Sequence, residues 1–116
     1  MSIRKLEAII RPERLSDVVA SLRQLGYPGL TISEVKGHGK QGGLTQQWRG
    51  REYKIEFLPK IKIEMYIPDD GKKLEDILEA IAEAACLGKV GDGKVFIWPI
   101  EDVMRLRTRE RGPDAV

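Results

Sequence analysis

Apolar and polar side chains alternate most clearly over residues 60–67. The apolar positions are Ile61, Ile63, Met65 and Ile67. Strict alternation has the period of a β-strand with one buried face. Residues 5–10 repeat the pattern, and short runs rich in branched or aromatic side chains at 30–35 and 95–98 predict two more strands, the last stopped by Pro99.

Two other segments carry apolar residues at helical spacing, and each predicts an amphipathic helix. Pro12 is tolerated near the first turn of the first helix, and Gly26 is placed to end it. Its apolar positions are Leu15, Val18, Val19, Leu22 and Leu25. Asp69 and Asp70 offer caps for the second helix, which Gly88 ends. Its apolar positions are Leu74, Ile77, Leu78, Ile81, Ala82 and Ala85.

The order strand, helix, strand, strand, helix, strand predicts an α+β fold. With right-handed crossovers it becomes a ferredoxin-like βαββαβ sandwich, in which both helices cover one face of a four-stranded antiparallel sheet. The other face would carry Ile9, Tyr66 and either Phe96 or Trp98. This is more apolar surface than a monomer normally exposes, so we expect an oligomer.

The segment at about 37–56, between the second and third strands, has neither a helical nor an alternating period. It begins with closely spaced glycines, which are unfavourable inside helices and strands, and continues as a polar tract containing Trp48 and Tyr53. Long segments of this kind are binding loops or are disordered. Because a solvating linker needs no large aromatic side chains, we interpret the segment as a binding loop.

Composition indicates one domain over residues 1–116, with a tail at about 108–116. The chain is 41% hydrophobic and 33% charged, and its net charge of +2 is too small to indicate nucleic acid binding by itself. The arginines from Arg105 to Arg111 predict a solvated tail. No apolar stretch approaches the roughly 20 residues that cross a bilayer, and the first residues lack a signal peptide's apolar core, so we expect a cytoplasmic protein.

The single cysteine and the single histidine give no sign of a metal or catalytic site. Cys86 lies at the end of the second predicted helix, where we expect it to pack, and His38 is expected to be a solvated loop side chain. The acids in plausible places are Glu52, Glu64 and Asp92, and no serine, cysteine or histidine dyad accompanies them. We therefore favour binding over catalysis.

Residues 88–95 nearly form a phosphate-binding P-loop, but the match fails. Val95 stands where a hydroxyl would hold magnesium, and the segment runs from a helix into a strand instead of the reverse. Closely spaced glycines still allow backbone N–H groups to approach an anion, and Lys89 and Lys94 supply charge. A second glycine and lysine segment at 37–40, with Arg105 and Arg107 past the last strand, suits a nucleotide polyphosphate. An ordinary turn remains the alternative for residues 88–95.

The chain resembles the PII-type nitrogen regulatory signal-transduction proteins from Leu6 to Arg107. The resemblance rests on five motifs: Ala8-Ile9-Ile10-Arg11-Pro12, Glu34-Val35-Lys36-Gly37-His38-Gly39-Lys40-Gln41, Arg49-Gly50-Arg51-Glu52-Tyr53, Phe57-Leu58-Pro59-Lys60 and Gly91-Asp92-Gly93-Lys94. It implies a ferredoxin-like unit that assembles as a homotrimer through the uncovered sheet faces. It also implies a regulatory binding protein, not an enzyme, with weak ATP hydrolysis left open.

The resemblance further implies competitive binding of ATP or ADP in clefts between subunits. One subunit would supply Ile9, Gly37, Gly39, Lys40, Gly91, Asp92, Gly93 and Lys94. Its neighbour would supply Thr31, Glu64, Arg105 and Arg107. Gln41 would hold Mg²⁺ together with the ATP phosphates, the metal would chelate 2-oxoglutarate, and Lys60 would pair with the distal carboxylate. The ligand would then order or re-aim the long loop that partner proteins contact.

Departures from the family pattern concern the loop and one nucleotide contact. Tyr53 keeps the position that a uridylyltransferase modifies in relatives, although Trp48 and Arg51 change its surroundings. Leu87 stands where Ser or Thr is usual. Arg49 keeps the position that enters an ammonium transporter in relatives, so an ammonium transporter is one implied partner. An enzyme or kinase of nitrogen metabolism is the other candidate. The implied partner contacts are Trp48, Arg49 and Tyr53.

Two alternatives to the sensor of ATP, ADP and 2-oxoglutarate stay open. The chain could respond to ADP and ATP alone, without 2-oxoglutarate. It could also be a ferredoxin-like RNA-binding module, but such modules stack bases on aromatics of the two central strands, and those strands offer only Tyr66.

Overall fold

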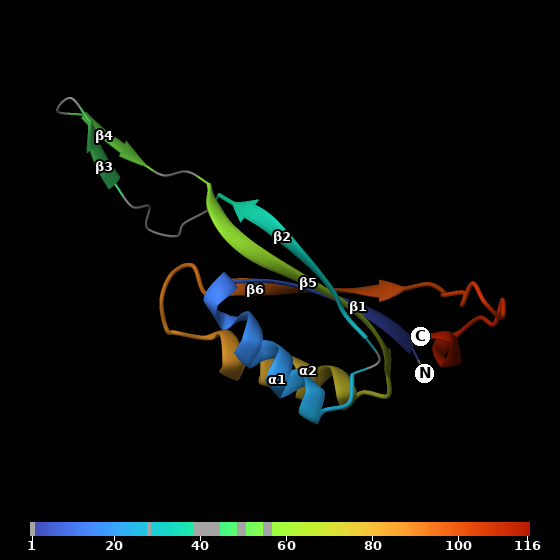
Figure 1. Ribbon diagram of the computed structural model, residues 1–116. Coiled ribbons are helices and arrows are strands. Elements are labelled where there is room, and N and C mark those ends of the chain that lie inside the picture. Colours follow the sequence, from blue (N-terminus) through green and yellow to red (C-terminus); the bar gives the residue numbers. More distant parts are fainter. Residues whose placement is uncertain (1, 28, 39–44, 49–50, 55–56) are drawn as a thin grey trace.

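The computed structural model describes residues 2–27, 29–38, 45–48, 51–54 and 57–116. Its main sheet contains four strands: β1 (Ser2–Ile10), β2 (Thr31–Gly37), β5 (Leu58–Asp69) and β6 (Gly93–Ile100). The helices α1 (Leu15–Gln24) and α2 (Lys73–Ala85) follow β1 and β5, and 3₁₀ turns occupy Pro12–Arg14 (η1) and Pro113–Ala115 (η2). Both helices lie on one side of the sheet (Figure 1). The predicted ferredoxin-like α+β fold is confirmed.

The sheet is antiparallel in the order β2-β5-β1-β6, so β1 and β5 are central. Alternate residues of these two strands face the helices and form the core with α1 and α2, as their period of two predicts. The fully buried members are Leu6, Ile10, Val18, Leu22, Ile63, Met65, Ile67 and Ile77. The two strands are therefore held in a register that fixes which of their residues reach the site at their ends.

Three prolines lie inside strands, namely Pro59 and Pro68 in β5 and Pro99 in β6, and the last two lie outside the boundaries that the sequence predicted. β6 continues through Pro99, which is opposite Arg4, and β5 continues through Pro68, which is opposite Ile3. Proline is tolerated where a strand has no neighbour on one side. β6 is an edge strand, and β5 pairs with β2 only as far as Glu64.

The aspartates before α2 cap it, as predicted. Asp69 Oδ1 accepts from the N–H groups of Gly71 and Leu74, and Asp70 Oδ1 accepts from those of Lys72 and Lys73. The Lys72 N–H bond is the largest contribution to the lowered pKa of Asp70. These bonds satisfy backbone donors that the first helical turn leaves free.

The predicted loop at 37–56 contains regular backbone that the sequence pattern did not indicate. Strands β3 (Thr45–Trp48) and β4 (Arg51–Lys54) form a separate two-stranded antiparallel sheet, in which Trp48 is opposite Arg51 and Gln46 is opposite Tyr53 (Figure 1). The sequence of these strands shows no apolar alternation that would have indicated them. Four residues predicted to bind ligands or partners lie outside the described residues: Gly39, Lys40, Gln41 and Arg49.

The C-terminal segment has backbone structure that the sequence did not indicate, although most of its residues are exposed, as in a solvated segment. Met104 bridges to Arg111, and η2 ends in Ala115, which is buried. Arg111 pairs with Asp102 and Arg105 pairs with Glu110. The N–H of Val103, followed by the Arg111 guanidinium, lowers the pKa of Asp102. Three of the four arginines are exposed, namely Arg107, Arg109 and Arg111. Among the described contacts, Arg105 and Arg111 make ion pairs.

Among the described residues, nothing covers the sheet face opposite the helices, and this face carries both aromatics of β6 beside charged side chains such as Lys5 and Glu7. Tyr66, Phe96 and Trp98 are 41%, 48% and 39% exposed. The Nζ of Lys5 lies 4.7 Å from the ring centre of Trp98 and 5.6 Å from that of Tyr66. We name Ile9, Tyr66, Phe96 and Trp98 the uncovered face. None of the described helices is both long and apolar enough to cross a membrane.

Candidate functional site

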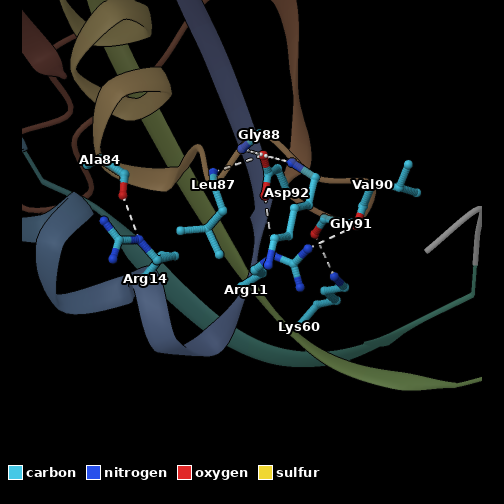
Figure 2. Close-up of polar contacts among 10 residues, drawn as sticks. Arg11, Arg14, Lys60, Ala84, Leu87, Gly88, Val90, Gly91 and Asp92 are labelled. Atoms are coloured by element: carbon cyan, nitrogen blue, oxygen red, sulfur yellow. Dashed lines mark hydrogen bonds and ion pairs between the residues drawn. The ribbon is translucent and has the colours of Figure 1, made fainter. Parts of the chain in front are cut away.

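The glycine-rich loop between α2 and β6 is shaped by the side chain of Asp92. Its Oδ2 accepts three successive backbone bonds, from Leu87 N (2.9 Å), Gly88 N (2.9 Å) and Lys89 N (3.1 Å) (Figure 2). These donors would otherwise be free, since α2 has ended and β6 has not begun. The arrangement is an anion nest already filled by the chain's own carboxylate.

Arg11, at the end of β1, fixes the same loop from the other side. Its Nε donates to Asp92 Oδ1 at 3.3 Å and its Nη2 donates to the carbonyl of Val90 at 2.9 Å. The arginine is 14% exposed and the aspartate 20%. Charge-assisted bonds of this kind are stronger than neutral ones, so they tie the loop to the end of β1. The next arginine, Arg14, donates its Nε to the carbonyl of Ala84 and so secures the end of α2 (Figure 2).

Lys60, the first fully enclosed residue of β5, reaches the loop from below. It is 8% exposed, and its Nζ donates to the carbonyl of Gly91 at 2.9 Å (Figure 2). Its side chain passes over Gly37, where a Cβ would lie 3.1 Å from Lys60 Cγ. Burial, followed by the nearby Arg11 charge, lowers the pKa of Lys60. The described residues supply it with a neutral acceptor and no carboxylate within ion-pair distance. An incoming carboxylate would therefore find an unneutralised ammonium group.

The bonds to Arg11 and Lys60 also set the direction of the loop amides. A trans peptide places its C=O and N–H on opposite sides, and the chain's described bonds include no cis peptide. Since the carbonyl of Val90 is turned toward Arg11, the N–H of Gly91 points away from that arginine. It is a backbone donor that a bound anion can use, whereas the N–H of Asp92 is taken by the Lys89 carbonyl at 3.2 Å.

The acid sensitivity of the loop follows from the pKa of Asp92. Burial alone would raise this pKa, but the N–H groups of Lys89, Leu87 and Gly88 and the Arg11 guanidinium lower it to about 2. Because the folded pKa is below the ordinary 3.8, the stabilisation is complete above pH 4 and is lost as the pH falls toward 2. We expect urea midpoints of the wild type and Asp92→Asn to differ at pH 5 and to converge near pH 2. A difference independent of pH would contradict this account.

The register divides the predicted nucleotide residues into two groups. Ile9 lies opposite Lys94 and Ile10 opposite Gly93, at the same sheet end as Gly37 and the loop 87–92. Thr31 lies opposite Glu64, six residues from Gly37 along β2. Arg105 and Arg107 follow the other end of β6, near the C-terminus (Figure 1). One chain brings the first group together and leaves the second apart from it.

Sequence reasoning missed the role of Arg11 and Arg14, and it gave Asp92 only a ligand contact. The contacts of Arg11 join residues 79 and 81 positions apart, which no local pattern reports. Its place directly after a strand end was the only signal. Leu87 takes part through its N–H, so its unusual side chain leaves this contact intact. In the described parts of the chain, no three His, Cys, Asp or Glu side chains gather as metal ligands would.

Together, these features define a small ferredoxin-like α+β protein with a glycine-rich loop held at one end of its sheet. Comparison with known proteins gives its family. The profile described as nitrogen regulatory protein P-II matches residues 3–110. The chain is 46% identical to the nitrogen regulatory protein P-II of Azospirillum brasilense and 48% identical to that of Mesorhizobium japonicum, over 98% of this chain and all of each relative. The chain belongs to the nitrogen regulatory protein P-II family, whose members are regulatory signalling proteins.

Solved structures agree with this assignment. B. subtilis GlnK superposes with a TM-score of 0.80 at 28% identity over all of both chains, and its ATP complex gives 0.77 at 26% identity over 99% of this chain and 98% of the other. Arabidopsis thaliana PII bound to citrate gives 0.78 at 35% identity, over 99% of this chain and 92% of the other.

Proposed function

We propose that this protein is a cytoplasmic sensor that binds ATP or ADP, and 2-oxoglutarate in the presence of Mg²⁺ and ATP, and regulates partner proteins through its long loop. The observation that carries the proposal is the bond from Lys60 to Gly91, which joins the root of the long loop to the glycine-rich loop (Figure 2). A ligand that competes for Lys60 would act on both segments at once. The ATP complex of GlnK and the citrate complex of Arabidopsis PII support a nucleotide and a small carboxylate as ligands.

The nucleotide would bind between two copies of the chain. One copy would use Ile9, Gly37, Gly91, Gly93 and Lys94, with Gly39 and Lys40 from the undescribed segment. The other would supply Thr31, Glu64, Arg105 and Arg107. Glycine amides and cations of this kind suit a polyphosphate. The separation of the two groups within one chain supports this, because Arg105 and Arg107 follow the far end of β6 and a second copy can bring them to the first group.

The 2-oxoglutarate site would use Lys60 for the distal carboxylate. Gln41, outside the described residues, would hold Mg²⁺ with the ATP phosphates, and the metal would supply the charge that binds the 2-oxo acid end. Lys60 fits this role because its ammonium group is enclosed and bonded only to a neutral carbonyl among the described groups. A chain that responds only to ATP and ADP is the alternative, and it would leave Lys60 without this role.

A nucleotide site shared by two copies of the chain requires that the copies assemble. We propose a homotrimer formed through the uncovered face. Trp98→Asp should convert it to monomers, because a buried charge would replace a large aromatic contact, and ATP binding should weaken with assembly. Light scattering and ATP titration measure both. Leu25→Asp is a matched control, since Leu25 is equally exposed at 38% but lies at the end of α1. A trimer that survives Trp98→Asp with wild-type ATP affinity would contradict the assignment of this face.

Partners would contact the long loop, which holds Trp48, Arg49 and Tyr53. An ammonium transporter or an enzyme or kinase of nitrogen metabolism is the proposed partner, and Tyr53 is the proposed acceptor of a uridylyl group. Any membrane association would come through the transporter. An intact mass that stays unchanged after incubation with a uridylyltransferase and UTP would exclude Tyr53. The family assignment supports this regulatory role over an RNA-binding module.

A further inference from the structure

The C-terminal segment holds the side chain of Arg105 at two points. The Nη1 of Arg105 donates to Glu110 Oε2 at 2.8 Å, and Nη2 donates to the carbonyl of Asp114 at 3.0 Å. Arginine has five N–H donors, so these two bonds leave three for another partner. The pair is only partly exposed, at 36% for the arginine and 45% for the glutamate. The guanidinium is therefore oriented by its own chain and still able to bind an anion.

The support behind these two contacts is built independently of Arg105's side chain. The backbone of Arg105 and Glu110 closes a turn, with Arg105 N donating to Glu110 O at 2.8 Å and Arg109 N donating to Arg105 O at 2.7 Å. Arg109 has φ 61, in the left-handed region that non-glycine residues seldom occupy. The turn is kept by Gly112, whose N–H donates to Val103 O and to Asp102 Oδ1, and by the Asp102–Arg111 pair.

We propose that Glu110 is a positioning residue for nucleotide binding, which holds the guanidinium of Arg105 ready for the phosphates of a nucleoside triphosphate on a neighbouring copy. The inference rests on the proposed function, in which Arg105 contacts the nucleotide. A free arginine side chain loses rotamer freedom when it binds, and one already held by Glu110 and Asp114 loses less. The segment at 108–116 thereby becomes a part of the site.

ATP titration of the full chain by calorimetry tests the proposal. Glu110→Ala removes the contact and should weaken ATP binding about three- to tenfold, the range for one immobilised side chain. Glu110→Gln keeps an oxygen that accepts from Nη1 and should bind ATP as the wild type does. Glu79→Ala is the matched control, because Glu79 is an exposed glutamate on α2 that makes no ion pair among the described residues, and its loss should leave ATP affinity unchanged.

The effect of Glu110 must also depend on Arg105. Arg105→Ala should itself bind ATP more weakly than the wild type. Adding Glu110→Ala to it should cause no further loss of ATP affinity. If Glu110→Ala acted by loosening the fold in general, it would lower ATP affinity in this background too. Tighter binding by Glu110→Ala, or an equal loss with and without Arg105, would overturn the positioning role. If Arg105→Ala binds ATP like the wild type, the nucleotide assignment of Arg105 fails as well. Thermal unfolding of each variant checks that the chain is folded.

Discussion

Replacing Gly93 with alanine is expected to destabilise the protein by about 3 kcal/mol or more, which is among the largest effects of a single methyl group. A Cβ at Gly93 would lie 1.8 Å from the carbonyl oxygen of Ile9, and Gly93 has φ 109, where side chains are strained. Because Ile9 belongs to the central strand β1, the backbone cannot move aside without opening the pairing of β1 and β6. Urea unfolding at neutral pH measures the change.

Gly71→Ala separates the two causes of this loss. Gly71 has φ 97, close to that of Gly93, but a Cβ there meets no atom within 4 Å. It should lose only the conformational part, about 1–2 kcal/mol. Equal losses in the two variants would show that the contact with Ile9 does not matter, and would place Gly93 further from β1 than the structure does.

Lys60→Met is expected to reduce 2-oxoglutarate binding about tenfold to a hundredfold, while leaving the fold stable. The ammonium group is the proposed partner of the distal carboxylate, and charged hydrogen bonds are worth about 1.5–3 kcal/mol. Methionine fills a similar space without a charge. The lost bond to Gly91 is offset by the removal of a buried ammonium group, so the unfolding free energy should change by less than about 1 kcal/mol. Calorimetry with Mg²⁺ and ATP and urea unfolding measure the two quantities.

Lys36→Met is the control for the loss of a positive charge. Lys36 lies on β2 directly before Gly37 and is exposed, so its loss removes a positive charge near the site without changing the buried Lys60 side chain. It should change 2-oxoglutarate affinity by less than about threefold, because exposed charges are screened. If Lys36→Met and Lys60→Met weaken binding equally, Lys60 acts through the general field and not as a direct partner.

The elements of the fold could be predicted wherever burial imposes a period. Ile61, Ile63, Met65 and Ile67 alternate because one face of β5 meets the helices, and they are buried as expected. A strand without this alternation of apolar and polar residues cannot be recognised from the sequence pattern. β3 and β4 pair only with each other, and their polar sequence carries no alternation. Pro99 predicts a strand end because a proline cannot donate to a ladder, but the outer side of the edge strand β6 needs no donor.

The sequence indicated which segments form the candidate site, but not the hydrogen bonds and ion pairs that join them. The glycine and lysine spacing at 91–94 located the glycine-rich loop, and binding of an anion there stays a prediction. The contacts of Arg11 with this loop cross about two-thirds of the chain, and those of Glu110 with Arg105 depend on a left-handed Arg109 that no residue preference predicts. Such tertiary contacts appear only when the sheet register brings distant segments together.

Titration of 2-oxoglutarate into the protein with Mg²⁺, once with ATP and once with ADP, tests the central claim most directly. We expect binding heat with ATP and none with ADP, because the triphosphate completes the site for the 2-oxo acid. Lys60→Met should remove that heat. No heat with either nucleotide, although both remain bound, would contradict the account and leave a protein that responds to ATP and ADP alone.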